Sequence, residues 1–430
     1  MRAKLTLLST LALGTFSGAV ISGCQSYDFE PVEPLAIAQT TVEETIKARN
    51  RKPNIMMLVD ISGSMTDPVD TADPDCQVPD GDRVATCGGS LPCNTALCPT
   101  RWTELQAAVP RFLANSGPFV RFGLTTYPET NGSTSNAVAC NASTVRSVLK
   151  DLPTAEDDTS LLAHANQINA LIQGIPNAGA GRPLGGTPTS RSLRFVGGLE
   201  ALQSSDRKDY VILLTDGLPN CNPDNANDGS NATACKCTQT GSAACTGSFS
   251  RSGCLDMDAS VAAVQELYGK EITTIVIGFG AETAGGNGPA VLDAMARAGG
   301  FARTCAQGQT VCGPGDPCDP VTRLCSRSFY QAGNQVELAQ ALAAISKEIL
   351  PGEPCLVELN AAQLPSDPKL IVVYVDGVRT LSGDGTWSLQ VVPSDASKTG
   401  VLFTGATCER ILNSTPDAPI NIEVRAIRQR

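Results

Sequence analysis

The sequence predicts an α/β fold with a doubly wound, mostly parallel sheet, followed by a small all-β module. Three continuous apolar runs are typical of strands that are buried on both faces. Segments with helical periodicity lie between these runs, and strands that alternate with helices form parallel sheets with right-handed crossovers. The chain has 430 residues, of which 42% are hydrophobic, enough for one large or two ordinary domains.

The elements of the α/β part can be assigned in chain order. Buried strands are predicted at residues 54–60, 210–215 and 272–279, with a short strand at 329–331. Helices are predicted at residues 102–115, 161–172, 190–202, 256–268, 289–298 and 337–349. Pro110 should kink the first helix, because proline lacks the backbone N–H of a helix interior. Residues 120–127 and 138–145 flank a turn and are expected to form a hairpin.

The composition changes at residue 353, where the C-terminal module, residues 353–430, is predicted to begin. Strand candidates are residues 355–359, 370–376, 387–392, 401–404 and 420–426. Two Asp-Gly pairs between them are typical turn signals. Cys355 and Cys408 are the module's only cysteines and are predicted to pair. The module could serve as an accessory packing surface or as a second binding domain.

The composition also limits the possible chemistry. One histidine in the chain excludes zinc sites built on several histidines. Any Ser-His-Asp mechanism would have to use His164, which lies at the edge of a helix's apolar stripe. The net charge of −11 argues against nucleic acid as a partner. No nucleophile-elbow, phosphate-loop or zinc-peptidase motif is present, so we do not expect an enzyme.

The N-terminus has the pattern of an export signal. Two basic residues precede an uncharged apolar run at residues 5–20, and small residues then lead to Cys24. The pattern resembles a bacterial lipoprotein signal peptide, residues 1–23, which implies that Cys24 is lipidated. An ordinary signal peptide or an uncleaved anchor are the alternatives. Residues 24–52 are then expected to be a tether with at most one short helix.

The expected location follows from this signal. No later apolar run approaches the ~18 residues needed to span a bilayer, so the lipid would be the only membrane contact. Gln25 follows the lipidated cysteine, which by the usual rule for such proteins implies the outer membrane of a bacterial cell envelope. The leaflet, periplasmic or surface-facing, stays open, and secretion without the lipid is the alternative.

Seventeen cysteines indicate an oxidising compartment. If Cys24 is lipidated, an even number remains for disulfides. Three loops carry most of them: the first loop (residues 66–100) has Cys76, Cys87, Cys93 and Cys98; the second loop (218–255) has Cys221, Cys235, Cys237, Cys245 and Cys254; the third loop (304–327) has Cys305, Cys312, Cys318 and Cys325. The second loop has an odd number and cannot close on itself. Cys140 is its simplest outside partner, and an exchange with the first loop is the alternative.

Polar motifs follow two of the buried strands. The first strand ends in DISGS from residue 60, the second ends in TDG from residue 215, and GGTP lies between them from residue 185. The carboxyl ends of parallel strands meet at one edge of a doubly wound sheet, where ligands bind. The motifs offer only hard oxygen donors, which suit Mg²⁺, with Mn²⁺ or Ca²⁺ as alternatives. We call these five residues the donor set: Asp60, Ser62, Ser64, Thr187 and Asp216.

The motifs DxSxS, GGTP and TDG, in this order, resemble those of a von Willebrand factor type A (vWA) domain with an intact metal-ion-dependent adhesion site. The resemblance covers residues 53–350, with interruptions by the loops. It implies that the two serines and Thr187 contact the metal directly and that the two aspartates act largely through water. It also implies an open coordination position for a Glu or Asp from a protein partner.

The first and second loops each follow a motif-bearing strand, so both should rise from the edge of the sheet that carries the metal. They could select partners, or their disulfides could serve only for survival outside the cell. Six aspartates in the first loop could hold a structural Ca²⁺, although their spacing differs from that of an EF-hand. The third loop precedes the short strand and should lie at the opposite edge.

These observations lead to a main hypothesis and two alternatives. We expect a non-enzymatic, lipid-anchored envelope protein that captures a partner's carboxylate through a Mg²⁺ site. One alternative is a structural subunit of an envelope or surface-motility complex, whose metal only steadies the fold. The other is a metal-dependent hydrolase, which would lack a placed base or nucleophile apart from the metal carboxylates.

Overall fold

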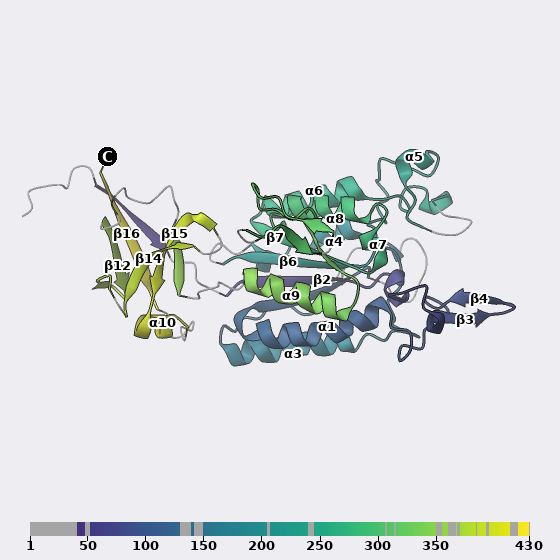
Figure 1. Ribbon diagram of the computed structural model, residues 1–430, viewed down its shortest axis with the longest axis horizontal. Coiled ribbons are helices and arrows are strands. Elements are labelled where there is room, and N and C mark those ends of the chain that lie inside the picture. Colours follow the sequence, from purple (N-terminus) through teal and green to yellow (C-terminus); the bar gives the residue numbers. More distant parts are fainter. Residues whose placement is uncertain are drawn as a thin grey trace, which may run out of the picture.

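The computed structural model describes residues 41–47, 52–129, 139–141, 149–203, 207–239, 245–305, 308–313, 315–349, 355–359, 367, 370–383, 385–392, 395–412 and 420–429. All structural statements concern these residues. Figure 1 shows a larger α/β body and a smaller lobe that is formed mainly by the C-terminal residues.

The body is built around a parallel sheet of five strands in the order β10-β7-β6-β2-β5. The strands are β2 (Asn54–Asp60), β5 (Arg121–Tyr127), β6 (Asp209–Thr215), β7 (Ile272–Phe279) and β10 (Tyr330–Ala332). Every neighbouring pair is parallel. All residues of β2 and β6 are buried, because helices cover both faces of the sheet. The predicted doubly wound fold class is therefore confirmed.

Helices form a layer on each face of the sheet (Figure 1). One face carries α1 (Arg101–Ser116), α3 (Asp158–Gln173) and α9 (Gln335–Ile349). The other face carries α4 (Thr189–Val196), α6 (Met257–Tyr268) and α8 (Gly288–Ala298). Side chains of β2 alternate between the two cores, with Met57 in the first and Met56 and Leu58 in the second. Because side chains on both faces of β2 are buried in a core, its sequence is a continuous apolar run.

Short elements fill the connections. They are β3 (Gln77–Asp80), β4 (Arg83–Thr86), α5 (Ala232–Cys235), α7 (Ala281–Ala284), β8 (Val311–Gly313), β9 (Asp316–Pro317) and the 3-10 helices Gly63–Thr66, Pro74–Cys76, Gly117–Phe119, Glu200–Leu202 and Gly247–Phe249. α4 is shorter than predicted, because the chain leaves the helix at Gly197 and continues as a 3-10 turn. α1 runs through Pro110 without a break in its assignment.

The prediction that residues 120–127 form one arm of a hairpin is wrong. β5 pairs in parallel with β2, and on its other side the backbone of Leu124 exchanges two hydrogen bonds with Lys150. Most of the predicted second arm lies outside the described residues, and Ala139 within it is helical. The apolar pattern alone did not distinguish a hairpin arm from a parallel edge strand.

The C-terminal module consists of two small antiparallel sheets, in the orders β1-β16-β12-β13 and β11-β15-β14. Its strands are β11 (Leu356–Leu359), β12 (Ile371–Val375), β13 (Val378–Thr380), β14 (Trp387–Val392), β15 (Asp395–Phe403) and β16 (Ile422–Gln429). Val373, Val401 and Phe403 are among its buried core residues. The module also contains a helix, α10 (Gly405–Leu412), so it is not purely β.

The first strand within the described residues belongs to this module. β1 (Thr41–Lys47) pairs antiparallel with β16 along its whole length, from Thr41 opposite Gln429 to Lys47 opposite Glu423. β12 occupies the other edge of β16, so β1 satisfies a row of backbone groups that would otherwise be open. Part of the expected tether at residues 24–52 is therefore a strand rather than a short helix, and residues near both ends of the chain share one sheet.

None of the helices within the described residues combines the length and the apolar character that a bilayer crossing requires. The predicted signal peptide, residues 1–23, and Cys24 lie outside the described residues.

Candidate metal centre

The donor set begins where two neighbouring strands end. β2 and β6 pair in parallel, so Asp60 at the end of β2 and Asp216 just after β6 reach the same edge of the sheet. Both carboxylates are completely buried. Figure 1 shows the hairpin of β3 and β4 and the helix α5 at this end of the body. The first and second loops therefore rise from the predicted edge.

A chain of contacts joins four members of the donor set. The Ser62 N–H donates to Asp60 Oδ1 at 2.8 Å. Ser62 Oγ lies 3.1 Å from Ser64 Oγ, and Ser64 Oγ donates to Asp216 Oδ1 at 3.0 Å. Thr215 Oγ1 donates to Asp60 Oδ2 at 2.7 Å and so fixes the second oxygen of that carboxylate. Two carboxylates and two hydroxyls thus converge on one position.

Thr187 joins the other four through the backbone of its loop. The Gly63 N–H donates to the Gly185 carbonyl at 2.9 Å, and the Leu184 N–H donates to the Ile61 carbonyl at 2.8 Å. These bonds place the GGTP segment directly beside the DISGS segment. Thr187 itself is 4% exposed. The topology therefore brings all three motifs to one edge of the sheet.

Arg101 is a site residue that sequence reasoning missed. It is the first residue of α1, and its Nη1 donates to Asp216 Oδ2 at 2.8 Å in a buried ion pair. A cation in the first turn of a helix is unfavourable beside the positive end of the helix dipole. An arginine at the start of a predicted helix was thus the available signal that an anion lies nearby.

The electrostatics of the two carboxylates favour a cation. Burial, and next the charge of Asp216, raise the pKa of Asp60 to about 7 despite hydrogen bonds from Thr215 and Ser62 that lower it. The same burial and the charge of Asp60 keep the pKa of Tyr127, at the end of β5, well above its usual value. Adjacent buried carboxylates with hydroxyl oxygens are the donors that Mg²⁺, Mn²⁺ and Ca²⁺ accept. The residues present therefore fit a divalent cation.

The aspartates of the first loop make a different kind of contact. Asp70 Oδ1 accepts the Ala72 N–H, and Asp73 Oδ1 accepts the Asp75 N–H, so these carboxylates cap local turns. Within the described part of the chain, the side-chain clusters with metal-ligand spacing all contain disulfide-bonded cysteines. A calcium site in this loop gains no support from the structure.

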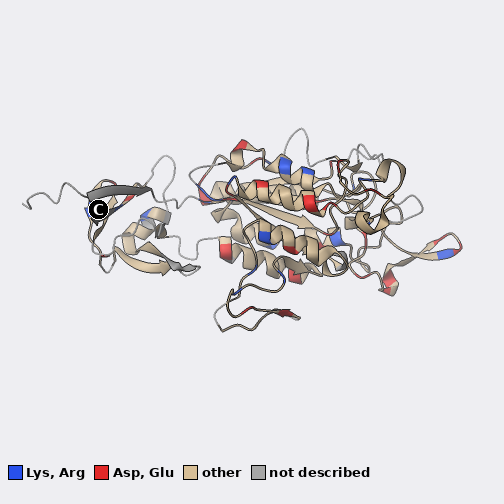
Figure 2. Ribbon diagram, turned by 90° about the horizontal axis from the view of Figure 1, so that it is seen from above, with Lys and Arg blue, Asp and Glu red and all other residues tan. Residues whose placement is uncertain are grey.

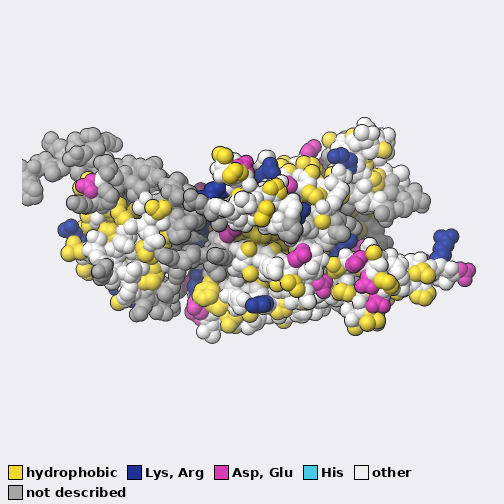
Figure 3. Space-filling model, in the orientation of Figure 1, with side chains coloured by type: hydrophobic (Ala, Val, Ile, Leu, Met, Phe, Trp, Pro, Cys, Tyr) yellow, Lys and Arg dark blue, Asp and Glu magenta, His cyan; other side chains and the backbone are white. Residues whose placement is uncertain are grey.

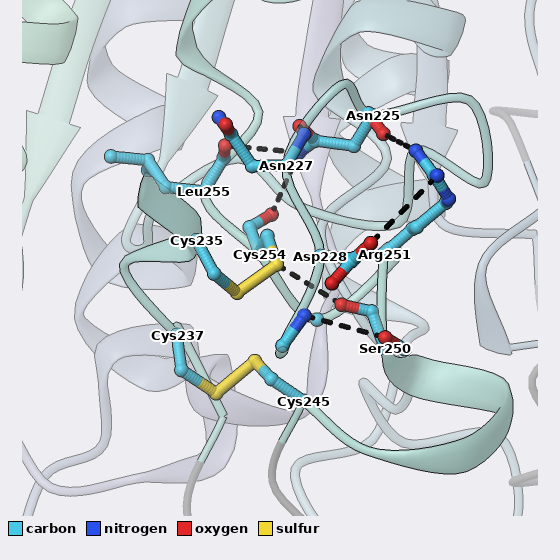
Figure 4. Close-up of a disulfide and its surroundings, with 12 residues drawn as sticks. Asn225, Asn227, Asp228, Cys235, Cys237, Cys245, Ser250, Arg251, Cys254 and Leu255 are labelled. Carbon is cyan, nitrogen blue, oxygen red and sulfur yellow. Dashed lines mark hydrogen bonds and ion pairs between the residues drawn. A yellow bond between two sulfur atoms is a disulfide. The ribbon is translucent and has the colours of Figure 1, made fainter. Parts of the chain in front are cut away.

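Eight disulfides join the cysteines that follow Cys24. They are Cys76–Cys98, Cys87–Cys93, Cys140–Cys221, Cys235–Cys254, Cys237–Cys245, Cys305–Cys318, Cys312–Cys325 and Cys355–Cys408. The second loop reaches Cys140, the simplest pairing that the odd count left open. Figure 4 shows its two internal disulfides side by side. Disulfides in this number are typical of an extracytoplasmic protein.

The surface has mixed character. Figure 2 shows basic and acidic residues interspersed over the helices of the body rather than separated onto two faces. Figure 3 shows hydrophobic side chains scattered over the face in view.

His164 lies on α3, where it lines a cavity with residues 149–155 and Gln167. None of the donor set lines that cavity.

The fold and the site define an α/β domain with an oxygen-donor site at the carboxyl edge of its sheet. No family model matches the chain, and no curated protein matches it. Among solved structures, it is similar to the pilus adhesin SpaC from Lactobacillus rhamnosus GG, with 14% identity and a TM-score of 0.37. That match covers 91% of this chain and 41% of SpaC, so the chain spans less than half of its length.

Two further structures are similar. One is proximal thread matrix protein 1 from the mussel byssus with a zinc-occupied MIDAS motif, at 10% identity and a TM-score of 0.34, covering 74% of this chain and 52% of that protein. The other is the manganese-loaded TRAP protein of Plasmodium vivax, at 14% identity and a TM-score of 0.28, covering 56% of this chain and 62% of that protein.

Proposed function

We propose that the protein is a non-enzymatic binding module that captures a carboxylate of a protein partner through a divalent cation. Mg²⁺ is the first candidate for the cation, with Mn²⁺ and Ca²⁺ as alternatives. The observation that carries the proposal is the convergence of buried Asp60 and Asp216 with Ser62 and Ser64, beside the loop of Thr187.

The charges at the site favour an acidic ligand. Asp60 and Asp216 contribute two negative charges, Arg101 contributes one positive charge, and a bound divalent cation adds two. The occupied site would therefore carry a net positive charge although the whole chain is acidic. Screening limits the effect of distant surface charges to about 8 Å at physiological salt, so an approaching carboxylate responds mainly to the site.

Each residue has a defined role in this proposal. The hydroxyls of Ser62, Ser64 and Thr187 would supply neutral oxygens to the cation, and the two aspartates would supply the negative charge that holds it. When bound, the cation supplies an open coordination position for a Glu or Asp side chain. Arg101 holds Asp216 in place, because the ion pair fixes Oδ2 while Oδ1 accepts from Ser64.

We further propose that the protein is held in the bacterial cell envelope by a lipid on Cys24, with the outer membrane as the expected location. The lipoprotein-like pattern of residues 1–23 and the disulfide-rich loops support this placement. The partner would be a protein rather than nucleic acid.

The first experiment measures cation binding. The chain from residue 24 is titrated with Mn²⁺ and followed by electron paramagnetic resonance, with Mg²⁺ as the competitor. We expect binding to one site, its loss in Asp60→Ala, and its retention in Asp80→Ala, a matched change in the exposed hairpin of β3 and β4. An Asp60→Ala variant that binds Mn²⁺ as the parent does would contradict the assignment.

The second experiment tests partner capture. The immobilised chain is incubated with envelope extracts in Mg²⁺ or in EDTA, and bound proteins are identified. Capture that is lost in EDTA and in Asp60→Ala would support the binding module. Capture that is insensitive to both would contradict it. Metal-dependent turnover of peptide, phosphate or glycan substrates would instead support the hydrolase alternative.

A further inference from the structure

A single buried residue, Asn220, holds both backbone groups of Thr187, one through its side chain and one through its own backbone. The Thr187 N–H donates to Asn220 Oδ1 at 2.8 Å, and the Asn220 N–H donates to the Thr187 carbonyl at 2.9 Å. Asn220 is 7% exposed and lies five residues after β6 in the second loop. The position of the threonine oxygen donor is therefore set from outside the donor set.

The stapled part of the second loop fixes Asn220 in turn. Asn220 Nδ2 donates to Thr238 Oγ1 at 3.0 Å, and Thr238 Oγ1 donates to the Gly253 carbonyl at 2.8 Å. Thr238 follows Cys237 and Gly253 precedes Cys254, so both lie beside the disulfides drawn in Figure 4. The side chain of Asn220 thus connects a disulfide-linked segment to the site.

The Cys140–Cys221 disulfide supports the same loop from its other side. Cys221 follows Asn220, and Cys140 follows Ala139, whose carbonyl accepts the Gly186 N–H at 2.8 Å. The disulfide therefore joins two segments that hold consecutive residues, Gly186 and Thr187. Both of its cysteines are buried.

Gly186 packs closely against Cys221 and Asn220. A Cβ at this position would lie 2.4 Å from Cys221 Sγ and 2.9 Å from Asn220 Oδ1. No side chain fits there, so the second glycine of the GGTP motif is required by the close approach of the disulfide. The backbone of the motif rests directly on Asn220 and Cys221.

We propose that Asn220 and the Cys140–Cys221 disulfide, together the Thr187 clamp, position Thr187 for the cation and so raise the affinity of the site. The proposal rests on the proposed function, because it requires a cation at the donor set. Without the Thr187 clamp, cation binding would have to order the GGTP loop, and this ordering would reduce the affinity. Asn220 is thus a positioning residue that acts through Thr187.

The test is a thermodynamic cycle on Mn²⁺ affinity in the full chain from residue 24. Asn220→Ala should weaken binding about tenfold, as expected for a residue that orients a metal ligand. In a Thr187→Ala background, Asn220→Ala should cause no further loss, because the oxygen it positions is absent. Asn231→Ala, a matched change in the same loop at the start of α5, should leave the affinity unchanged.

Two further variants separate positioning from folding. Thr238→Ala removes the hydroxyl that holds Asn220, together with a methyl group, and should weaken Mn²⁺ binding. Thr238→Ser keeps the hydroxyl and should bind Mn²⁺ as the parent does. The double variant Cys140→Ser with Cys221→Ser should weaken Mn²⁺ binding. When Asn220→Ala is added to it, the total fold-loss of Mn²⁺ affinity should be smaller than the product of the two separate fold-losses. The melting temperature in EDTA is measured for each variant to report the fold separately.

The outcomes are distinct. Equal losses from Asn220→Ala with and without the Thr187 hydroxyl would overturn the proposal, because the residue would then act on the fold rather than through Thr187. Variants that lower the melting temperature in EDTA but bind Mn²⁺ normally would also overturn it. A parent chain that does not bind Mn²⁺ would instead overturn the proposed function, and this inference with it.

Discussion

Arg101 Nη1 and Asp216 Oδ2 lie 2.8 Å apart, and both side chains are almost fully buried at the carboxyl edge of the sheet. The pair joins the start of α1 to the end of β6. It gives one acidic ligand of the proposed cation a permanent counter-charge. Burial and the charge of Asp216 raise the pKa of the second aspartate, Asp60, and the hydrogen bonds from Thr215 and Ser62 offset this only in part.

Replacement of Arg101 by methionine should destabilise the cation-free protein strongly. The change leaves the Asp216 carboxylate buried without its ion pair, which typically costs about 3–5 kcal/mol. Mg²⁺ should recover more stability in this variant than in the parent, because the cation then offsets a larger negative charge. Denaturant unfolding in EDTA and in Mg²⁺ measures both effects.

Arg194→Met is the matched control for that prediction. Arg194 pairs with Glu266 on the surface, with side chains 42% and 51% exposed, so its loss should cost about 0–1 kcal/mol. Equal destabilisation of the two variants, or no extra gain from Mg²⁺ in Arg101→Met, would show that the buried pair does not shape the site.

The stability of the cation-free protein should fall as the pH rises from 5 to 8. Asp60 has a folded-state pKa of about 7 against an ordinary value of 3.8, so the folded state binds its proton more tightly than the unfolded state does. The stabilisation that the protonated Asp60 side chain contributes is complete below the ordinary pKa of 3.8 and is lost as the pH rises through about 7. Urea unfolding in EDTA at several pH values follows this change.

Asp60→Asn isolates this contribution, because its amide oxygen can still accept the Ser62 N–H while the charge is absent. At pH 8 in EDTA, the variant should be more stable than the parent by an amount on the order of 1–3 kcal/mol. At pH 5 the difference should shrink. Parallel pH profiles for the two proteins would refute the expected role of Asp60.

Gly186→Ala should damage the site from outside the donor set. The new methyl group would meet Cys221 Sγ and Asn220 Oδ1, and overpacking of this kind costs about 1–3 kcal/mol. Mn²⁺ affinity should fall together with stability, because the displaced atoms belong to the Thr187 clamp. Gly313→Ala is the control, since nothing lies within 4 Å of a Cβ at that position. An unchanged affinity in Gly186→Ala would contradict the packing described.

Removal of β1 should expose the edge of the C-terminal module. A chain that begins at residue 48 lacks the partner of β16, whereas one that begins at residue 41 keeps it. In the shorter chain, backbone amides of β16 should lose protection in hydrogen exchange, and self-association should increase because an open strand edge pairs readily. Equal protection in both chains would show that β1 contributes nothing to the module.

Much of the fold could be predicted because its signals are local. β2, β6 and β7 are continuous apolar runs, and each was placed to within one residue of the observed bounds. The site motifs were predictable for a related reason. A parallel sheet brings the ends of β2 and β6 to one edge, so Asp60 and Asp216 converge once the strands and their direction are known.

Other features had a weak local signal or none. α10 was missed because the strand pattern around it favoured a purely β module. β1 was missed because nothing in its sequence indicates that it pairs with β16. Arg101 was missed because its place at a helix start indicates a nearby anion but does not identify it, and Asp216 lies far away along the chain. Asn220 is one of many asparagines in polar loops, and nothing in its neighbours distinguishes it.

By itself, the sequence determined the positions of the buried strands, the order of the three oxygen-bearing motifs and the parity of the cysteines. These properties depend on side chains close together in the chain. Only the tertiary structure decided that Arg101 neutralises Asp216, that Cys221 pairs with Cys140, that Asn220 holds Thr187 and that β1 completes the sheet of β16. Each of these contacts joins segments that are far apart in sequence, and packing of the whole chain is what brings them together.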